Sequence, residues 1–492
     1  MPLNDVTPIS RLVRDEIFGG DDDDEISESE ATCSSDREYS WNSETILEIL
    51  RKDFPHIMQP NTHLISQLNL PVEKVLEWNC VVSCDELTGG VENDSVKVAI
   101  SFSANHNDKV IELPTQYYVF RIYNDQEKTK EYIKFELCTL FFLGQNSFPV
   151  PFVILPTAEL VAFVQSNYSK FPDMEKAVLE YVDGRLCALF SYVHGFHVDK
   201  GKKTVNQVTQ ISMFLGSLHK LTQFNGYSML DMKATIQDMV QMRSGVTKLT
   251  FSYITEAMQS VMEEIQTLKS QVITLTQENF PNKGYSQEKI DHANRYNNKV
   301  LSLLDNLKNI LESNVKDLNI IELTEKELLL PHSIVHADIH ENNVLFTKSQ
   351  DNQDVISGVV DWDDSQYGPQ ILDFIKGFIF WCISKVVTPD VDYNEFDLFD
   401  DDLIRIYKST YEHYRGFPIS EEEKNLMIPY SHLIICAQVD FFIHALNAEE
   451  LFVLPNHNLH EWEDKNFEPF CALTWFNRIC RELVKKIELI LK

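Results

Sequence analysis

The 492-residue sequence lacks the features that define several large classes of protein. No apolar run reaches the roughly 18 residues that a membrane-spanning helix needs, so we expect no membrane span. Residues 1–5 lack the basic-then-apolar pattern of a secretory signal, which favours a cytoplasmic protein. The nine cysteines are scattered, odd in number and without a Cys-x-x-Cys pair, so neither a disulfide framework nor a cysteine zinc site is indicated.

Positive charge is also scarce. The chain has 43 Lys and Arg against 75 Asp and Glu, which gives a net charge of −32. Such a charge repels nucleic acid and anionic membrane surfaces, so we expect neither as a partner. Residues 1–40 alone hold 12 acidic and 3 basic side chains, including the acidic run 21–25. This composition predicts an acidic, disordered tail over residues 1–45.

The sequence does contain enough apolar material for a large folded protein. Hydrophobic residues make up 43% and charged residues 24%, which is typical of globular proteins, and the length exceeds what one core supports. We therefore expect two lobes, the first strand-rich and covering residues 46–189. The Gly89-Gly90 pair is typical of a turn within that lobe. The predicted strands are 81–86, 95–102, 117–123 and 187–193, with a helix at 131–143.

A helical pattern dominates residues 245–330. Apolar residues there recur at alternating steps of about four and three, which predicts an antiparallel pair of long helices inserted in a mostly helical lobe over residues 190–492. Each apolar stripe is only a few heptads long, so a subdomain packed on its neighbour is favoured over an intermolecular coiled coil. The stripes are Ile254, Met258, Val261, Ile265, Leu268, Val272 and Leu275, and then Val300, Leu304, Leu307 and Leu311.

The densest cluster of polar residues lies between two apolar runs, within residues 333–346. Strand-forming residues on both sides predict a short strand, a polar loop and a second strand. A further strand, 356–360, ends in a group of acids. The polar side chains of the loop are His336, Asp338, His340 and Asn343, and the acids are Asp361, Asp363 and Asp364.

The spacing His-x-Asp-x-x-x-x-Asn, followed by an apolar strand that closes in Asp, is the arrangement that phosphoryl transfer requires. Asp338 is the candidate general base for an attacking hydroxyl group, and His336 is expected to brace the loop. Asn343 and Asp361 offer oxygen atoms, which are the ligands that Mg²⁺ prefers. This combination is the most specific chemical signal in the sequence.

Two other motifs give weaker signals. The set His336, Asp338 and His340 suggests a metal site, but a zinc hydrolase needs more ligands at defined spacing. Residues 195–202 resemble a phosphate-binding loop, yet five residues rather than four separate the glycines, and Lys203 stands where Ser or Thr is required. We reject the phosphate-binding loop, disfavour the zinc site, and expect His340 to act in the loop or on the substrate side.

The segments HADIHENNVLF (336–346) and GVVDWDD (358–364) resemble the aminoglycoside phosphotransferase and choline kinase superfamily, the small-molecule branch of the protein-kinase-like fold. Choline/ethanolamine kinases resemble this chain at 85–93 and 119–124. Homoserine kinases and aminoglycoside phosphotransferases resemble it at 184–195 and 214–221. The resemblance covers roughly residues 80–385 and implies a bilobal α+β fold that binds ATP and Mg²⁺ in the cleft between its lobes.

Carried over residue by residue, the resemblance assigns further roles. Arg121 would contact the α- and β-phosphates and Glu136 would pair with it, while Gly89 and Gly90 would let the backbone approach the nucleotide. Tyr192, within the hinge segment 190–194, would lie beside the adenine. Asp373 would support the catalytic loop. The chain departs from protein kinases in having Arg121 in place of lysine, although both cations pair with phosphate, and Asp-Trp-Asp in place of Asp-Phe-Gly.

On the substrate side, the resemblance points to His340, Asp363 and Trp381. Trp381 ends an aromatic cluster where choline kinases place part of a cation-binding cage, although its spacing fits core packing at least as well. The implied reaction is phosphorylation of a hydroxyl group on a small amino alcohol or hydroxy amino acid, of the choline/ethanolamine or homoserine/hydroxylysine type.

Two other functions stay open. A protein kinase is disfavoured because no Gly-x-Gly-x-x-Gly loop precedes Arg121 and no Ala-Pro-Glu segment follows Asp361. A catalytically silent, kinase-like scaffold is the remaining alternative. The presence of all four catalytic side chains argues against it.

Overall fold

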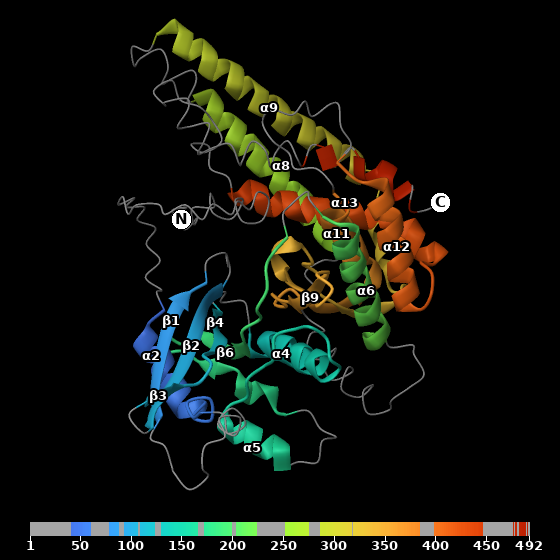
Figure 1. The fold of residues 1–492 in the computed structure, drawn as a ribbon. Helices are drawn as coiled ribbons and strands as arrows, with labels where there is room; N and C mark the ends of the chain where they lie inside the picture. The colour runs from blue at the N-terminus through green and yellow to red at the C-terminus, as the bar shows by residue number, and fades with distance from the viewer. Residues whose placement is uncertain are drawn as a thin grey trace.

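The computed structural model describes most of the chain between residues 41 and 490. The predicted acidic tail up to residue 40 lies outside the described part, as do Gly89 and Gly90. A strand-rich first part is followed by a mostly helical second part (Figure 1), which confirms the predicted α+β class. The described residues are 41–60, 78–87, 93–106, 109–123, 129–165, 172–198, 203–223, 251–274, 286–316, 318–383 and 398–445, with 476, 478–479, 482–488 and 490.

The first part is built on an antiparallel sheet in the order β1-β2-β4-β6-β5, with β3 paired to β2. Alternation along β4 directs Phe120 and Ile122 to a fully buried core, and places Arg121 on the opposite face. The four predicted strands overlap observed ones, whereas the short β3 and β5 were not predicted. The strands are β1 (Trp78–Glu86), β2 (Asn93–His106), β3 (Lys109–Glu112), β4 (Gln116–Tyr123), β5 (Leu179–Glu180) and β6 (Leu186–Ser191).

Helices cover both faces of this sheet. The helix α2 (Ser43–Asp53) begins at Asn42, whose side chain accepts hydrogen bonds from the first-turn backbone, and buries Ile46 and Leu50 against the sheet. The helix α4 (Lys130–Gln145) contains the predicted helix and lies on the side that faces the second part (Figure 1). Two further helices are α5 (Thr157–Gln165) and the short η1 (Met174–Ala177).

The second part combines helices with two small antiparallel sheets. The polar loop joins β7 to β8 and contains the short helix η3, and β9 carries the acids at its end. The strands are β7 (His332–Val335), β8 (Val344–Lys348), β9 (Asp354–Val359) and β10 (Gln366–Pro369), and η3 is Glu341–Asn343. The helices are α6 (Val205–Thr222), α8 (Phe251–Thr274), α9 (Gln287–Val315), α10 (Ile320–Glu327), α11 (Gln370–Trp381), α12 (Asp401–Arg415) and α13 (Glu421–Ala445).

The predicted helical pair is present as α8 and α9, which project from the second part (Figure 1). The ion pair between Lys269 and Asp305 joins them in an antiparallel arrangement, because Met258 lies beside Glu312 at the other end. Every stripe residue whose side chain is described is buried. Among the described helices, none has the length and apolar character to cross a membrane. The cytoplasmic location stays a prediction.

The two parts are joined by a segment whose backbone passes close to β8 and β9. Phe196 and Phe346 exchange backbone hydrogen bonds of 2.9 Å in both directions. A Cβ atom on Gly195 would lie 2.5 Å from the hydroxyl of Ser357 and 2.8 Å from the carbonyl oxygen of Phe346. The approach of the linking segment to the polar loop therefore requires glycine at this position.

Candidate active site

The carboxylate of Asp373 anchors the start of the polar loop. This side chain is fully buried on α11 and accepts 2.7 Å hydrogen bonds from the backbone N–H groups of His336 and Ala337. Ala337 has a φ of 66°, a left-handed conformation that a residue with a Cβ rarely adopts. Burial favours a raised pKa for Asp373, but the hydrogen bonds with His219 and with the backbone N–H of His336 outweigh it and hold the pKa below its usual range. The buried anion fixes the strained turn.

His336 braces the loop from behind, in one tautomer. Its Nδ1 accepts from the backbone N–H of Asp338 at 3.2 Å, so the proton of the neutral ring lies on Nε2, which donates to the carbonyl oxygen of Val360 at 2.9 Å. Burial lowers the pKa of His336 and keeps the ring neutral. The ring therefore links the loop to the end of β9.

Asp338 lies at the centre of a group of hydrogen-bond donors. Its Oδ2 is 3.0 Å from Nδ2 of Asn343 and 3.1 Å from Nε2 of His340, and its Oδ1 is 3.2 Å from Nζ of Lys376. Burial favours a raised pKa for Asp338, but the ammonium of Lys376, followed by His340, outweighs it and holds the pKa well below its usual range. The carboxylate is therefore ionised and oriented.

Asp361 faces this group from the end of β9. Its φ of 62° is left-handed, and the preceding residue, Val360, donates a 2.9 Å backbone hydrogen bond to Asn343. The pKa of Asp361 is raised to about 8, first by burial and then by the negative charges of Asp363, Asp338 and Glu136. The positive charge of Arg121 lowers this pKa but does not outweigh them. Negative charge is thus in excess around this carboxylate.

That excess, together with the donor atoms present, fits a magnesium ion. No group of three or more His, Cys, Asp or Glu side chains within the described residues forms a self-contained metal cage. Asn343 and Asp361 instead offer two oxygen-bearing side chains. Their backbones lie close together, because the N–H of Val360, next to Asp361, donates a 2.9 Å hydrogen bond to the carbonyl oxygen of Asn343. Mg²⁺ characteristically takes one or two protein ligands and completes its shell with phosphates and water.

Arg121 reaches this group from the strand-rich part. Its Nη1 lies 3.3 Å from Oε1 of Glu136, and its Nη2 lies 3.1 Å from Oδ1 of Asp361. The hydroxyl of Tyr123 donates to the other oxygen of Glu136 at 2.8 Å and so orients this carboxylate. A planar guanidinium with several N–H donors suits a diphosphate. The pairing of Arg121 with Glu136, fifteen residues apart on a strand and a helix, is as predicted.

Asp363 and Trp381, both predicted on the substrate side, are buried in the structure. Asp363 accepts a 2.9 Å hydrogen bond from Asn93 and, through its carbonyl oxygen, one from the hydroxyl of Tyr132, so it joins the two parts. Trp381 has no exposed surface and donates to the carbonyl oxygen of Ile339 at 3.1 Å. The aromatic ring supports the loop from within the core, and this placement does not support the predicted contact.

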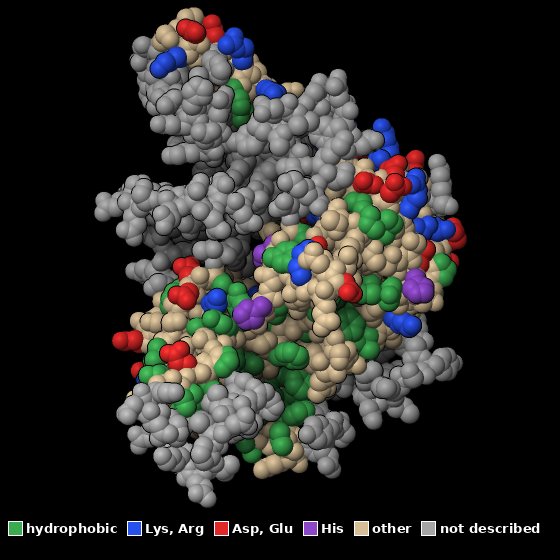
Figure 2. Space-filling model, viewed as in Figure 1, with side chains coloured by type: hydrophobic (Ala, Val, Ile, Leu, Met, Phe, Trp, Pro, Cys, Tyr) green, Lys and Arg blue, Asp and Glu red, His purple; other side chains and the backbone are tan. Residues whose placement is uncertain are grey.

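Tyr192 lies in the segment that links the two parts, as predicted. Its backbone N–H donates to the carbonyl oxygen of Tyr117 at 3.2 Å, and its ring packs against Tyr117 and His194. The ammonium of Lys97 lies 4.8 Å from the Tyr117 ring centre and 4.7 Å from that of Tyr192. Figure 2 shows histidine and basic side chains gathered on the visible face where the two parts meet.

Sequence reasoning missed Lys376 and Asn93. Lys376 is the one basic residue in the apolar helix α11, three residues after Asp373, and this isolated charge on the same helical face was a usable signal. Asn93 had no comparable signal, because its partner Asp363 is 270 residues away in the sequence.

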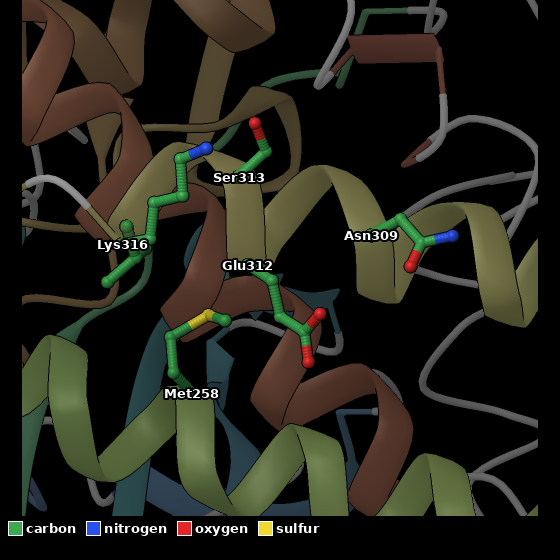
Figure 3. Close-up of a pocket in the computed structure, with 6 residues that line it drawn as sticks. Met258, Asn309, Glu312, Ser313 and Lys316 are labelled. Atoms are coloured by element: carbon green, nitrogen blue, oxygen red, sulfur yellow. The ribbon is translucent and has the colours of Figure 1, made fainter.

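A separate cavity of about 600 Å³ lies between α8 and α9 (Figure 3). Met258 points into it from α8, and the other lining residues belong to the end of α9. It combines one carboxylate, one ammonium and small polar groups without the paired acids or convergent donors found around Asp338. Its lining residues are Met258, Asn309, Glu312, Ser313, Val315 and Lys316.

Comparison with solved structures finds distant similarity to small-molecule kinases. A choline kinase from Cryptosporidium parvum Iowa II is 14% identical, with 91% of this chain and 98% of that chain covered and a TM-score of 0.43. A spectinomycin phosphotransferase solved with ADP and spectinomycin is 13% identical, covering 86% and 100%, with a TM-score of 0.39. An amicoumacin kinase solved with AMP-PNP and Ca²⁺ is 13% identical, covering 87% and 95%, with a TM-score of 0.40.

No curated protein matches the chain. The family model of the phosphotransferase enzyme family, by contrast, matches residues 87–412. This range includes Arg121, Glu136, Asp338, Asn343 and Asp361, and it covers more than half of the chain. The chain therefore belongs to the phosphotransferase enzyme family.

Proposed function

We propose that this protein transfers the γ-phosphoryl group of ATP, in the presence of Mg²⁺, to a hydroxyl group of a small amino alcohol or hydroxy amino acid. The observation that supports the proposal is the convergence of an oriented carboxylate, two oxygen-bearing side chains and a guanidinium from the other part of the chain. Phosphoryl transfer depends almost entirely on such positioning and on charge neutralisation.

Each side chain has a distinct task in this reaction. Asp338 takes the proton of the acceptor hydroxyl, because its carboxylate is ionised and held on both oxygens. Asn343 and Asp361 would hold the magnesium ion, whose charge would neutralise that of the phosphates. Arg121 contacts the phosphates and is kept in place by Glu136. Tyr192, in the linking segment, borders the adenine site.

The acceptor class rests on the resemblance of the catalytic segments to choline/ethanolamine and homoserine/hydroxylysine kinases. The test is phosphate transfer from ATP and Mg²⁺ to choline, ethanolamine, homoserine and hydroxylysine, followed by separation of the products. We expect one acceptor to be phosphorylated. If the protein binds ATP but phosphorylates none of these four compounds, the proposed acceptor class is contradicted.

Asp338→Asn tests the reaction itself. Loss of a general base lowers the rate about 10²- to 10⁴-fold, and MgATP binding should stay within about twofold of wild type because Asp338 does not contact Arg121. Asp305→Asn, which alters a half-exposed ion pair between α8 and α9, is the matched control and should retain full activity. Full-rate turnover by Asp338→Asn would exclude the assigned base. The alternative, a silent scaffold, predicts ATP binding without turnover even in the wild-type protein.

A further inference from the structure

The two oxygens of Asp338 differ in how many donors they already accept. Nδ1 of His340 accepts from the backbone N–H of Asn342 at 3.2 Å, so the ring proton lies on Nε2 and points to Oδ2 at 3.1 Å. Asn343 donates to the same oxygen at 3.0 Å. A carboxylate oxygen offers two lone pairs. Both lone pairs of Oδ2 are therefore in use.

The other oxygen keeps one lone pair for a further proton. Among the described residues, Lys376 is the single donor to Oδ1, with its Nζ at 3.2 Å. An acceptor hydroxyl thus has one place to deliver its proton, and Lys376 adjoins that place. The lysine is 7% exposed, so its position is set by the protein rather than by solvent.

The ammonium of Lys376 stays charged although it is buried. Burial favours a lowered pKa, but Asp338, Asp364 and Asp373 outweigh it and raise the pKa of Lys376 above its usual value. The helix α11 that presents it also presents Asp373, the anchor of the loop. Cation and carboxylate are therefore fixed on the same rigid element.

We propose that Lys376 is a catalytic residue that binds the phosphoryl group as it reaches the acceptor, and that Oδ1 of Asp338 is the atom that takes the proton. This inference rests on the proposed function. The acceptor O–H bond breaks, and its proton moves to Oδ1. The acceptor oxygen forms a bond to the γ-phosphorus, and the bond from that phosphorus to ADP breaks, its electron pair leaving with ADP.

Proton transfer changes the partner of Lys376 at the moment of reaction. Asp338 becomes neutral, so the ammonium loses its anion while negative charge gathers on the phosphoryl group beside it. The attraction of Lys376 for the phosphoryl group is thus stronger in the transition state than in the ground state, which is the condition for catalysis. A lysine that merely held Asp338 in place would not bind the phosphoryl group.

Aluminium fluoride with MgADP separates these two roles, because it mimics a phosphoryl group in transit and needs no acceptor. The experiment measures binding of MgADP, with and without aluminium fluoride, by calorimetry. The variants are Asp338→Asn, Lys376→Met, Lys376→Arg and the double variant Asp338→Asn/Lys376→Met. Lys269→Met is the matched control, since this lysine pairs with Asp305 far from the loop.

Wild type and Lys269→Met should bind MgADP more tightly with aluminium fluoride than without it. Asp338→Asn should enhance this tightening, because the ammonium is released from its anion. In Lys376→Met and in the double variant, the increase in MgADP affinity caused by aluminium fluoride should be smaller by about tenfold or more, while binding of MgADP alone is unchanged. Lys376→Arg should retain part of this increase. The double variant keeps the test valid should Lys376→Met fail to fold, because it leaves no unpaired buried carboxylate.

Equal tightening in Asp338→Asn and in the double variant would overturn the role of Lys376 and leave the proposed function intact. Failure of the wild-type protein to bind MgADP at all would instead overturn the proposed function, and the role of Lys376 with it. The two failures are therefore distinguishable.

Discussion

The two halves of the site are held in different ways. The Asp338 half is organised within the second part of the chain, since Asp373 and Lys376 come from α11 and His336, His340 and Asn343 from the loop itself. The phosphate half depends on contacts between the two parts, Arg121 with Asp361 and Asn93 with Asp363. The difference indicates that the proposed base is preorganised within the second part, whereas the proposed phosphate half exists only when the two parts are together.

The largest expected effect concerns the anchor of the base. Asp373→Asn replaces one of two accepting oxygens by an N–H₂ group that faces a backbone N–H, next to the strained Ala337. We expect a loss of about 3 kcal/mol in unfolding free energy, because hydrogen bonds to a charged acceptor contribute about 1.5–3 kcal/mol. Urea denaturation measures this loss. Asp305→Asn, the half-exposed counterpart, should change the free energy by less than about 1 kcal/mol.

A loss in Asp373→Asn as small as that in the control would show that the loop does not depend on this anchor. The claim that the Asp338 half is preorganised, in contrast to the phosphate half, would then be wrong.

The pH dependence of stability examines the phosphate half. The pKa of Asp361 rises from its ordinary 3.8 to about 8 in the folded protein. Between these values the folded state binds more protons at this group than the unfolded state does, so stability falls as the pH rises. Without Mg²⁺, the unfolding free energy of wild type should therefore fall relative to that of Asp361→Asn as the pH rises from about 4 to about 8.

Denaturation at several pH values, in buffer containing a chelator, measures the difference between these two proteins. Parallel pH profiles would show that no excess negative charge gathers at Asp361. A saturating concentration of Mg²⁺ and ATP should reduce the difference, because the bound cation favours the ionised carboxylate.

The smallest effect is expected for the hydrogen bond between Asn93 and Asp363. Asn93→Ala removes one contact between the parts, and such a bond contributes about 0.5–1.5 kcal/mol. We expect the KM for ATP to rise about threefold to tenfold while kcat changes less than about twofold, which steady-state kinetics measures. Asn79→Ala, on the exposed side of β1, is the control. A fall in kcat with unchanged KM would place Asn93 in the base half instead.

The predictable features were those that are local in the sequence. The helical stripes of α8 and α9, the strand runs, and the loop spacing from His336 to Asp361 all follow from periodicity or short motifs. The pairing of Arg121 with Glu136 also spans only fifteen residues. The roles assigned to these residues stay predictions.

The features that escaped sequence reasoning depend on the packing of distant segments. Lys376 meets Asp338 across 38 residues, and its only mark in the sequence is its isolated charge on the apolar helix α11. Asn93 meets Asp363 across 270 residues and has no such mark. Trp381 shows how one sequence pattern fits two placements. An aromatic residue after an acidic motif has the same sequence pattern whether its ring faces a ligand or the core. In Trp381 the ring is fully buried and donates to the carbonyl oxygen of Ile339.

The central claim is that one half of the site performs proton transfer while the other half binds the nucleotide. The most direct test measures MgATP binding and phosphate transfer side by side in Asp338→Asn and Arg121→Met. The account predicts that Asp338→Asn binds MgATP like wild type but transfers phosphate about 10²- to 10⁴-fold more slowly, whereas Arg121→Met loses about tenfold or more in MgATP affinity. Wild-type transfer rates in Asp338→Asn, or unchanged MgATP affinity in Arg121→Met, would contradict it.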